Sequence, residues 1–330
     1  MAEQLTLFGA PEPARGVVAA EPAAADVVEL AARLPERLYL GTSSWSFPGW
    51  KGIVWRGEHS EQQLARKGLA AYAAHPLFRT VGIDRTHYAP VPAQTFRDYA
   101  AVVPASFRFL AKAHESCTLA SFPSHPRYGT QRGAVNPLFL DAAYARDQVV
   151  APFVEGLGAH AGPLLFQFAQ QPLEQLGGSP RRFAEKLYRF LRDLPKGPLY
   201  CVELRNPQLL TDDYRAALRA AGAHHCVNAL PQMPPPDCQP VAPESPLVIR
   251  WLLAPHHTYE SALTAYRPFD RLLDPDLVTR RQLVTLLRDA LTRDVPIWLI
   301  VNNKAEGSAP LTIRELARSL DEERSDDVPF

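Results

Sequence analysis

The sequence predicts an α/β barrel built from eight strands. Eight short apolar runs recur along its 330 residues, and each of them ends in polar or charged side chains. Helical patterns separate most of these runs, which is the order typical of parallel strands joined by crossover helices. A single barrel of this kind commonly exceeds about 200 residues, so the length also fits. We therefore expect a TIM-like (β/α)8 barrel, with an open doubly wound sheet plus a second domain as the alternative.

The first half of the chain supplies four of the expected strands. They lie at 38–41, 80–83, 107–111 and 163–168, and helices are expected at 61–74, 92–101 and 139–157. Ser60 stands three residues before Gln63, a capping-box pattern that marks the beginning of the first helix. The irregular stretch 115–136 is long for a compact fold, and such loops are usually functional or mobile.

The second half repeats the alternation with one exception. Strands are expected at 199–204, 225–230, 247–253 and 296–301, and helices at 180–194, 211–221, 275–293 and 311–320. The segment 231–246 is too rich in proline to form a regular helix, because proline lacks the amide proton and clashes with the preceding turn. We therefore expect a degenerate sixth crossover.

The N-terminal residues differ in composition from the rest. Alanine, proline and glutamate dominate residues 10–25, with a short helix expected at 27–34. We interpret residues 1–35 as a flexible tail and residues 36–330 as the barrel.

The whole-chain composition excludes several classes of protein. Lysine plus arginine number 35, as do aspartate plus glutamate, so any nucleic-acid binding requires a local patch. No apolar run approaches the roughly 20 residues that span a bilayer, and the N-terminus lacks the pattern of a signal peptide. The four cysteines form no C-x-x-C pair. These features predict a cytoplasmic protein without disulfides or membrane association.

The polar residues that follow the strands predict a binding site. In such barrels the C-terminal ends of the strands gather around the active site. Side chains two apart on a strand share a face, so Lys112 lies with His114, and Glu203 with Arg205. Lysine and arginine would grip a phosphate or carboxylate, and Glu203 would act as general acid or base. The alternative is a structural Glu203–Arg205 ion pair.

The candidates fall into two groups. Those expected to carry chemistry are Glu203, Lys112, His114 and Asp84. Those expected to bind the ligand are Trp45, His87, Tyr88, Gln167, Arg205, Asn228, Arg250, Asn302 and Asn303. Trp45 would stack on a sugar or base, although packing over the barrel mouth explains it equally well.

Metal and cofactor signatures are missing from the sequence. There is no H-E-x-x-H, G-x-G-x-x-G, P-loop or G-x-S-x-G motif. His224 and His225 are adjacent on a strand and point to opposite faces, and the pair His256-His257 has no clear carboxylate partner. We expect no metal and no cofactor. A dispersed metal site built from His87, His114, Glu203 and Asp84 is the alternative.

Several short motifs stand at the strand ends in a fixed order. They include Gly41-Thr42-Ser43-Ser44-Trp45-Ser46, Gly162-Pro163-Leu164-Leu165-Phe166-Gln167, Glu203-Leu204-Arg205 with Pro207, and Asn302-Asn303 with Gly307, Ala309 and Pro310. With these motifs the chain resembles the YecE-like family, domain of unknown function 72, over residues 38–320. The resemblance implies a TIM-like barrel without an established activity. The family's barrel is similar to that of sugar isomerases and apurinic endonucleases, which by analogy suggests phosphate-bearing ligands.

This chain also departs from the family pattern. Gly82 stands where the family usually has glutamate, and His87 where it has an aromatic residue. Leu252 replaces the histidine of an R-L-H-G motif, and Lys304 stands where aspartate is common. These departures suggest a divergent branch with its own ligand.

A peptide in the tail resembles the motif by which bacterial proteins dock on the DNA polymerase sliding clamp, roughly Q-L-x-L-F. Its residues are Gln4, Leu5, Leu7 and Phe8. The glutamine would bond at a pocket rim while the apolar side chains fill a groove. The alternatives are that these residues fold back onto the barrel or match by chance.

Taken as a hypothesis, these features describe a barrel protein that binds an anionic ligand, either phosphate-bearing or nucleic acid, at the strand ends. Clamp docking would link it to DNA maintenance and repair, and an enzyme would be a hydrolase of phosphoester bonds. One alternative is a non-catalytic adaptor on a barrel scaffold. The other is a sugar isomerase or aldolase-type enzyme, which requires a metal or a Schiff base at Lys112.

Overall fold

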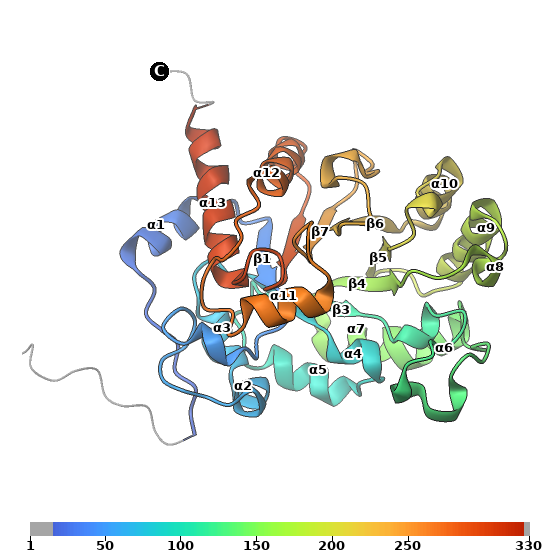
Figure 1. Cartoon of the computed structure of the whole chain (residues 1–330), viewed down its shortest axis with the longest axis horizontal. Coiled ribbons are helices and arrows are strands. Elements are labelled where there is room, and N and C mark those ends of the chain that lie inside the picture. Colours follow the sequence, from blue (N-terminus) through green and yellow to red (C-terminus); the bar gives the residue numbers. More distant parts are fainter. Residues whose placement is uncertain (1–15, 327–330) are drawn as a thin grey trace, which may run out of the picture.

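The computed structural model describes residues 16–326 as a closed barrel of eight parallel strands with helices around it (Figure 1). The strands are β1 Leu38–Thr42, β2 Thr80–Ile83, β3 Arg108–Lys112, β4 Ala161–Phe168, β5 Leu199–Leu204, β6 His224–Ala229, β7 Leu247–Trp251 and β8 Ile297–Val301. Each strand pairs with its neighbour in sequence, and β8 closes the ring by pairing with β1 from Leu38↔Ile297 to Thr42↔Val301. The expected barrel is confirmed, and the open-sheet alternative is excluded.

The helices follow the expected order, with three additional short ones at 85–88, 173–176 and 259–266. They are α1 Ala25–Arg33, α2 Glu61–Lys67, α3 Leu69–Ala73, α4 Arg85–Tyr88, α5 Ala93–Ala100, α6 Ala142–Ala145, α7 Ala151–Leu157, α8 Leu173–Leu176, α9 Pro180–Arg192, α10 Asp212–Ala221, α11 Tyr259–Tyr266, α12 Leu277–Thr292 and α13 Ala309–Asp326. Ser60 caps α2 by accepting a hydrogen bond from the Gln63 amide at 3.2 Å. The expected helix 61–74 is divided at Gly68, and the expected helix 139–157 is divided into α6, a π-helical turn and α7. Among the described residues, no helix is long and apolar enough to cross a membrane.

The sixth crossover is degenerate, as expected. Between β6 and β7 the structure has only a short 3-10 helix, Pro236–Cys238. The side chain of Gln239 substitutes for part of the missing helix at β6. Its Oε1 accepts from the Asn228 amide at 3.1 Å, and its Nε2 donates to the Asn228 carbonyl oxygen at 2.6 Å. One buried carboxamide therefore holds the proline-rich segment to the strand.

The folded part of the chain begins earlier than residue 36. Val18 is buried, Ala20 forms a β-bridge with Trp55, and α1 packs against α13. Helix α1 buries Val27 and Leu30, and Asp26 pairs with Arg318 of α13 at 2.6 Å. The expected tail boundary at residue 35 is therefore too late, because an apolar helix face follows the alanine- and proline-rich stretch. Residues 1–15 lie outside the described part.

The inside of the barrel changes from apolar to polar along the strands. The apolar inner side chains form a cluster containing Leu110, Leu165, Cys201, Cys226 and Val248. Two residues further along each of these five strands stand Lys112, Gln167, Glu203, Asn228 and Arg250, all of them buried. Since side chains two apart share a face of a strand, the second set also points into the barrel. The alternation thus places a polar layer at the C-terminal ends of the strands.

Candidate functional site

Glu203 lies at the centre of the polar layer and is fully buried. One of its carboxylate oxygens contacts Arg250 Nη1, and the other accepts from Arg205 Nε at 3.0 Å. Arg250 Nη1 also donates to Gln167 Oε1 at 2.9 Å. Burial alone would raise the pKa of Glu203, but Arg250 and Arg205 outweigh it and lower the pKa to about 2. A carboxylate held in this way is a poor proton donor or acceptor at neutral pH, so the geometry favours a structural and charge-positioning role over acid–base chemistry.

Lys112 and Asp84 form a second pair beside Glu203. The ammonium of Lys112, at the end of β3, lies 2.9 Å from Asp84 Oδ1, directly after β2. Lys112 is buried, and this burial lowers its pKa to about 8 although Asp84 opposes the change. Burial would raise the pKa of Asp84, but Lys112 and Arg250 lower it on balance. At neutral pH the pair is therefore charged, with a lysine proton that is easier to remove than usual.

Lys304 is the buried cation in this layer without a carboxylate partner. It is 5% exposed, and its ammonium lies 3.9 Å from the centre of the Tyr259 ring and 5.7 Å from that of Phe269. Within the part of the chain that the structure describes, no carboxylate lies within 4.0 Å of this ammonium. Burial and the charge of Arg267 lower the pKa of Lys304 to about 8. A buried ammonium without a carboxylate partner destabilises the folded protein unless an anion binds beside it.

We call this group of charged side chains the mouth cluster. Its members are Asp84, Lys112, Glu203, Arg205, Arg250 and Lys304. Four cations thus share the strand ends with two carboxylates, which leaves an excess of two positive charges. Such an excess in a partly buried layer favours an anionic ligand.

Two exposed tyrosines lie beside the mouth cluster. Tyr88 is 58% exposed and Tyr259 is 56% exposed, and partial burial together with the charge of Asp84 raises the pKa of both. The guanidinium of Arg127 lies 5.1 Å from the centre of the Tyr88 ring and pairs with Glu115 at 2.5 Å. Exposed aromatic faces next to a cationic layer can stack on a sugar or a base.

His87 lies next to Tyr88, but its ring is fixed by contacts within the protein. Its Nδ1 is 3.4 Å from the Ala113 carbonyl oxygen, and its Nε2 is 3.7 Å from Glu115. Burial and the charge of Lys112 lower the pKa of His87 to about 3, so the ring is neutral at physiological pH. A neutral imidazole can donate or accept one hydrogen bond, which suits a role in ligand orientation.

The asparagines at the strand ends make hydrogen bonds within the protein, although Asn228 Oδ1 and Asn303 Nδ2 are buried without a hydrogen-bond partner among the described residues. Asn303 Oδ1 accepts from Trp50 Nε1 at 3.1 Å and from the Ala309 amide at 2.8 Å, which anchors the beginning of α13. Asn302 Oδ1 accepts from the Lys304 amide at 3.0 Å, and Asn228 Nδ2 donates to the Leu204 carbonyl oxygen at 2.9 Å. These contacts favour a role in the barrel wall over the expected role in ligand binding.

The side chains of Trp45 and His114 also make contacts within the protein and not with the mouth cluster. Trp45 is 6% exposed and packs edge-on against Tyr99, so its face is not available for stacking on a ligand. His114 Nδ1 lies 2.6 Å from the Tyr144 hydroxyl of α6. Neither residue makes a contact with the mouth cluster among the described interactions. The sequence pattern missed Tyr259 and Arg127, which lie within the loops after β7 and β3 and not directly at the strand ends.

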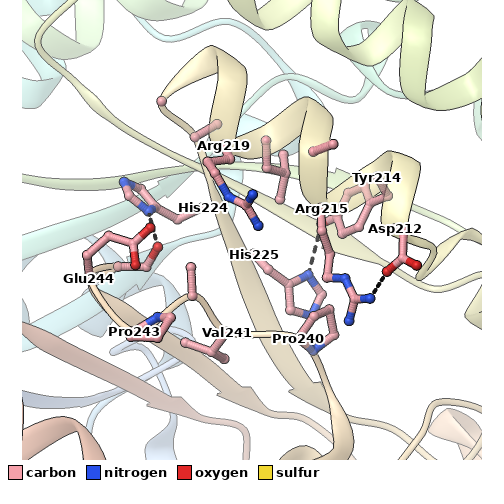
Figure 2. A pocket seen from close by; sticks show the side chains of 16 residues that line it. Asp212, Tyr214, Arg215, Arg219, His224, His225, Pro240, Val241, Pro243 and Glu244 are labelled. Carbon is pink, nitrogen blue, oxygen red and sulfur yellow. Dashed lines mark hydrogen bonds and ion pairs between the residues drawn. The ribbon is translucent and has the colours of Figure 1, made fainter.

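A large cavity lies elsewhere, beside the degenerate sixth crossover (Figure 2). Its volume is about 780 Å³, and it lies between α10 and residues 240–245. Its two histidines already have partners: His224 is 3.0 Å from Ser245, and His225 is 2.9 Å from Tyr214. The two histidines bind different neighbours, as expected for adjacent strand residues. We favour the mouth cluster as the site because, within residues 16–322, it combines strand ends with a buried cation that lacks a carboxylate partner.

A second cavity of about 740 Å³ lies between α7 and residues 195–199, next to Trp298. The Trp298 ring stacks on Tyr39 with a centroid distance of 4.9 Å. Both residues belong to the N-terminal half of the barrel interior, where barrel enzymes place stability rather than catalysis.

Comparison with known proteins agrees with the barrel. The profile of the family described as "Protein of unknown function DUF72" matches residues 39–329. The chain is similar to a solved DUF72 family protein from Thermotoga maritima, with 20% identity, a TM-score of 0.54, and coverage of 87% of this chain and 99% of that one. A DUF72 family protein from Enterococcus faecalis gives 17% identity, a TM-score of 0.53 and coverage of 86% and 95%. No curated protein matches the sequence.

Proposed function

The chain belongs to the DUF72 family, whose description names no activity, and we propose that this member binds a phosphate-bearing anion at the mouth of its barrel. The observation that carries the proposal is Lys304, a buried ammonium without a carboxylate partner in the described chain. Lys112, Arg205 and Arg250 add positive charge on the neighbouring strands. A phosphate offers several acceptor oxygens and up to two negative charges, which matches this excess.

The two exposed tyrosines beside the mouth cluster suggest which chemical group the phosphate is attached to. Tyr88 and Tyr259 expose their rings on the solvent side of the cluster, and both could stack on a flat group. A nucleotide or a short single strand carries a flat base and a phosphate together. We therefore assign a nucleotide or oligonucleotide as the first ligand class to test, with sugar phosphates as the second.

Phosphoester hydrolysis is the reaction class that we infer for this site. Lys112 has a proton that can pass to a leaving oxygen, because burial lowers its pKa to about 8. Arg205, 28% exposed at its side chain, could compensate the charge that develops on the phosphate oxygens. Glu203 would fix both arginines instead of exchanging protons. Binding without turnover would instead favour the non-catalytic adaptor, and borohydride trapping of Lys112 would favour aldolase-type chemistry.

The binding proposal is tested by titrating the full-length protein with inorganic phosphate, a mononucleotide and a short single-stranded oligonucleotide. Lys304→Met should weaken binding about tenfold or more, since a lost charged hydrogen bond is worth about 1.5–3 kcal/mol. Lys196→Met is the matched control, because Lys196 is exposed and precedes β5 at the opposite end of the barrel. Equal affinity of the two variants for every probe would remove Lys304 from the site and the proposal with it.

The link to DNA maintenance is a separate proposal that depends on the tail. Gln4, Leu5, Leu7 and Phe8 lie outside the described residues, so sliding-clamp docking stays a prediction from their pattern. Binding of the full chain to a bacterial sliding clamp, compared with a Leu7→Ala/Phe8→Ala variant, tests it. Binding that is equal in both proteins would show that the motif is not used.

A further inference from the structure

The loop that follows β7 brings two histidines against an aspartate. His256 Nε2 lies 2.6 Å from Asp274 Oδ2, and His257 Nε2 lies 3.9 Å from the same oxygen. Asp274 comes from the segment between α11 and α12, eighteen and seventeen residues after the two histidines. The expectation that the histidine pair lacks a carboxylate partner is therefore wrong, because the partner is supplied by a later segment. One ligand atom from each of the three residues lies within 4.8 Å of the others.

Neighbouring groups hold two of these side chains in place. Tyr266 donates its hydroxyl to Asp274 Oδ2 at 2.7 Å, and His257 Nδ1 is 2.9 Å from Ser261 Oγ. The second contact leaves His257 Nε2 turned toward Asp274. Outer contacts of this kind are usual around metal-binding histidines and carboxylates, because they fix the tautomer and the orientation of the ring.

The backbone around Asp274 is also anchored. The amides of Leu273 and Asp274 donate to the Glu306 carbonyl oxygen at 2.9 and 3.2 Å. The carboxylate of Glu306 is in turn buried and binds Arg280 at 2.7 and 2.8 Å. The aspartate therefore sits on a stiff support, which lowers the entropic cost of organising ligands around an ion.

We propose that His256, His257 and Asp274 bind a divalent first-row transition-metal ion, with Zn²⁺ as the best match. Two imidazole nitrogens and one carboxylate oxygen are typical ligands of such ions, whereas Mg²⁺ prefers oxygen ligands alone. The ion would enter between His256 and Asp274, whose side chains are 62% and 33% exposed. Three protein ligands leave at least one position of the ion open to water or another ligand. This proposal does not rest on anion binding at the mouth cluster.

The test is a Zn²⁺ titration of full-length protein that has been freed of metal by a chelator and dialysed. One equivalent should bind to the wild-type chain, and Mg²⁺ in excess should not compete. His256→Ala/Asp274→Asn should lose this binding, and Tyr266→Phe should weaken it about tenfold because only an outer contact is removed. His125→Ala/Asp147→Asn is the matched control, since both residues are exposed and lie outside the three-residue group.

A second measurement keeps the test valid if the double variant folds poorly. His256 is the most exposed of the three ligands, so His256→Ala alone should leave the unfolding temperature in metal-free buffer unchanged. Zn²⁺ should raise the unfolding temperature of the wild type by mass action and should not raise that of His256→Ala. Equal Zn²⁺ affinity and stoichiometry in the wild type and in His256→Ala would overturn the proposal, as would equal competition by Mg²⁺.

Discussion

Replacing Glu203 with glutamine removes the carboxylate that lies between Arg250 and Arg205 and leaves both guanidinium groups in place. Arg250 is 2% exposed, so it would keep a buried charge without its main partner. Breaking a buried pair by removing one member costs about 3–5 kcal/mol. The pKa gives a similar figure, because its fall from the ordinary 4.5 to about 2 corresponds to about 3 kcal/mol of preference for the charged form in the folded state.

The assay is urea unfolding of the wild type and Glu203→Gln, followed by circular dichroism at several pH values. We expect Glu203→Gln to lower the free energy of unfolding by about 3 kcal/mol at pH 7. Because the folded-state pKa lies below the unfolded-state value, the carboxylate stabilises the fold fully above about pH 5 and loses this effect as the pH falls toward 2. The difference between the two proteins should therefore shrink over that range.

Two further variants identify the origin of the effect. Glu203→Gln/Arg250→Met should recover part of the lost stability, since it removes the unpaired charge as well. Arg181→Met breaks the exposed pair with Glu185 and should change the stability by less than about 0.5 kcal/mol. A Glu203→Gln protein as stable as the wild type, but inactive on a phosphoester, would refute the structural interpretation and restore Glu203 as a catalytic residue.

Three other predictions test the site and its surroundings. Lys304→Met should raise the free energy of unfolding at pH 7, and it should reduce the gain in stability that the wild type shows between about pH 8 and 10.5, where the unfolded chain still holds the lysine proton. Urea unfolding across that range measures both effects. An unchanged dependence of stability on pH would contradict a buried ammonium without a carboxylate partner. Affinity for a phosphate probe should fall as the pH rises through about 8, where Lys112 and Lys304 lose their protons, so equal affinity at pH 7 and 9 in calorimetry would argue against both as ligands. Gly82→Ala should cost about 1–3 kcal/mol, because a Cβ there would lie 2.8 Å from the Ser43 carbonyl oxygen, and a variant with wild-type urea stability would show that β2 can move aside.

The order of the strands and the position of the polar layer followed from local patterns. The ends of the apolar runs placed Lys112, Glu203 and Arg250 near the strand ends, and period-two alternation put Glu203 on the same face as Arg205. The hydrogen-bond and ion-pair partners of those residues could not be predicted from the sequence. Arg250 reaches Glu203 across 47 positions of sequence, so the sequence could not show that both carboxylate oxygens are occupied.

Residues at a strand end look alike whether they bind a ligand or the protein itself. Asn303 fits both patterns, and only the positions of Trp50 and Ala309 show that it anchors α13. Tyr259 was missed for the opposite reason. It belongs to a helix in the loop after β7, where no strand pattern points toward the mouth. Asp274 likewise reaches His256 from a segment with no motif of its own.

The way in which Gln239 holds the sixth crossover has a consequence for local opening. A crossover helix would bury an apolar face over β6 and β7, whereas here a proline-rich segment and one carboxamide cover part of that side. Loss of the Gln239 contacts exposes the Asn228 amide without unfolding the other strands. Hydrogen exchange should therefore be fastest, among the strand amides, at this seam between β5 and the end of β6, where the pairing of these two strands has already ended. The prolines limit how far it opens, because they restrict the conformations that the freed segment can reach.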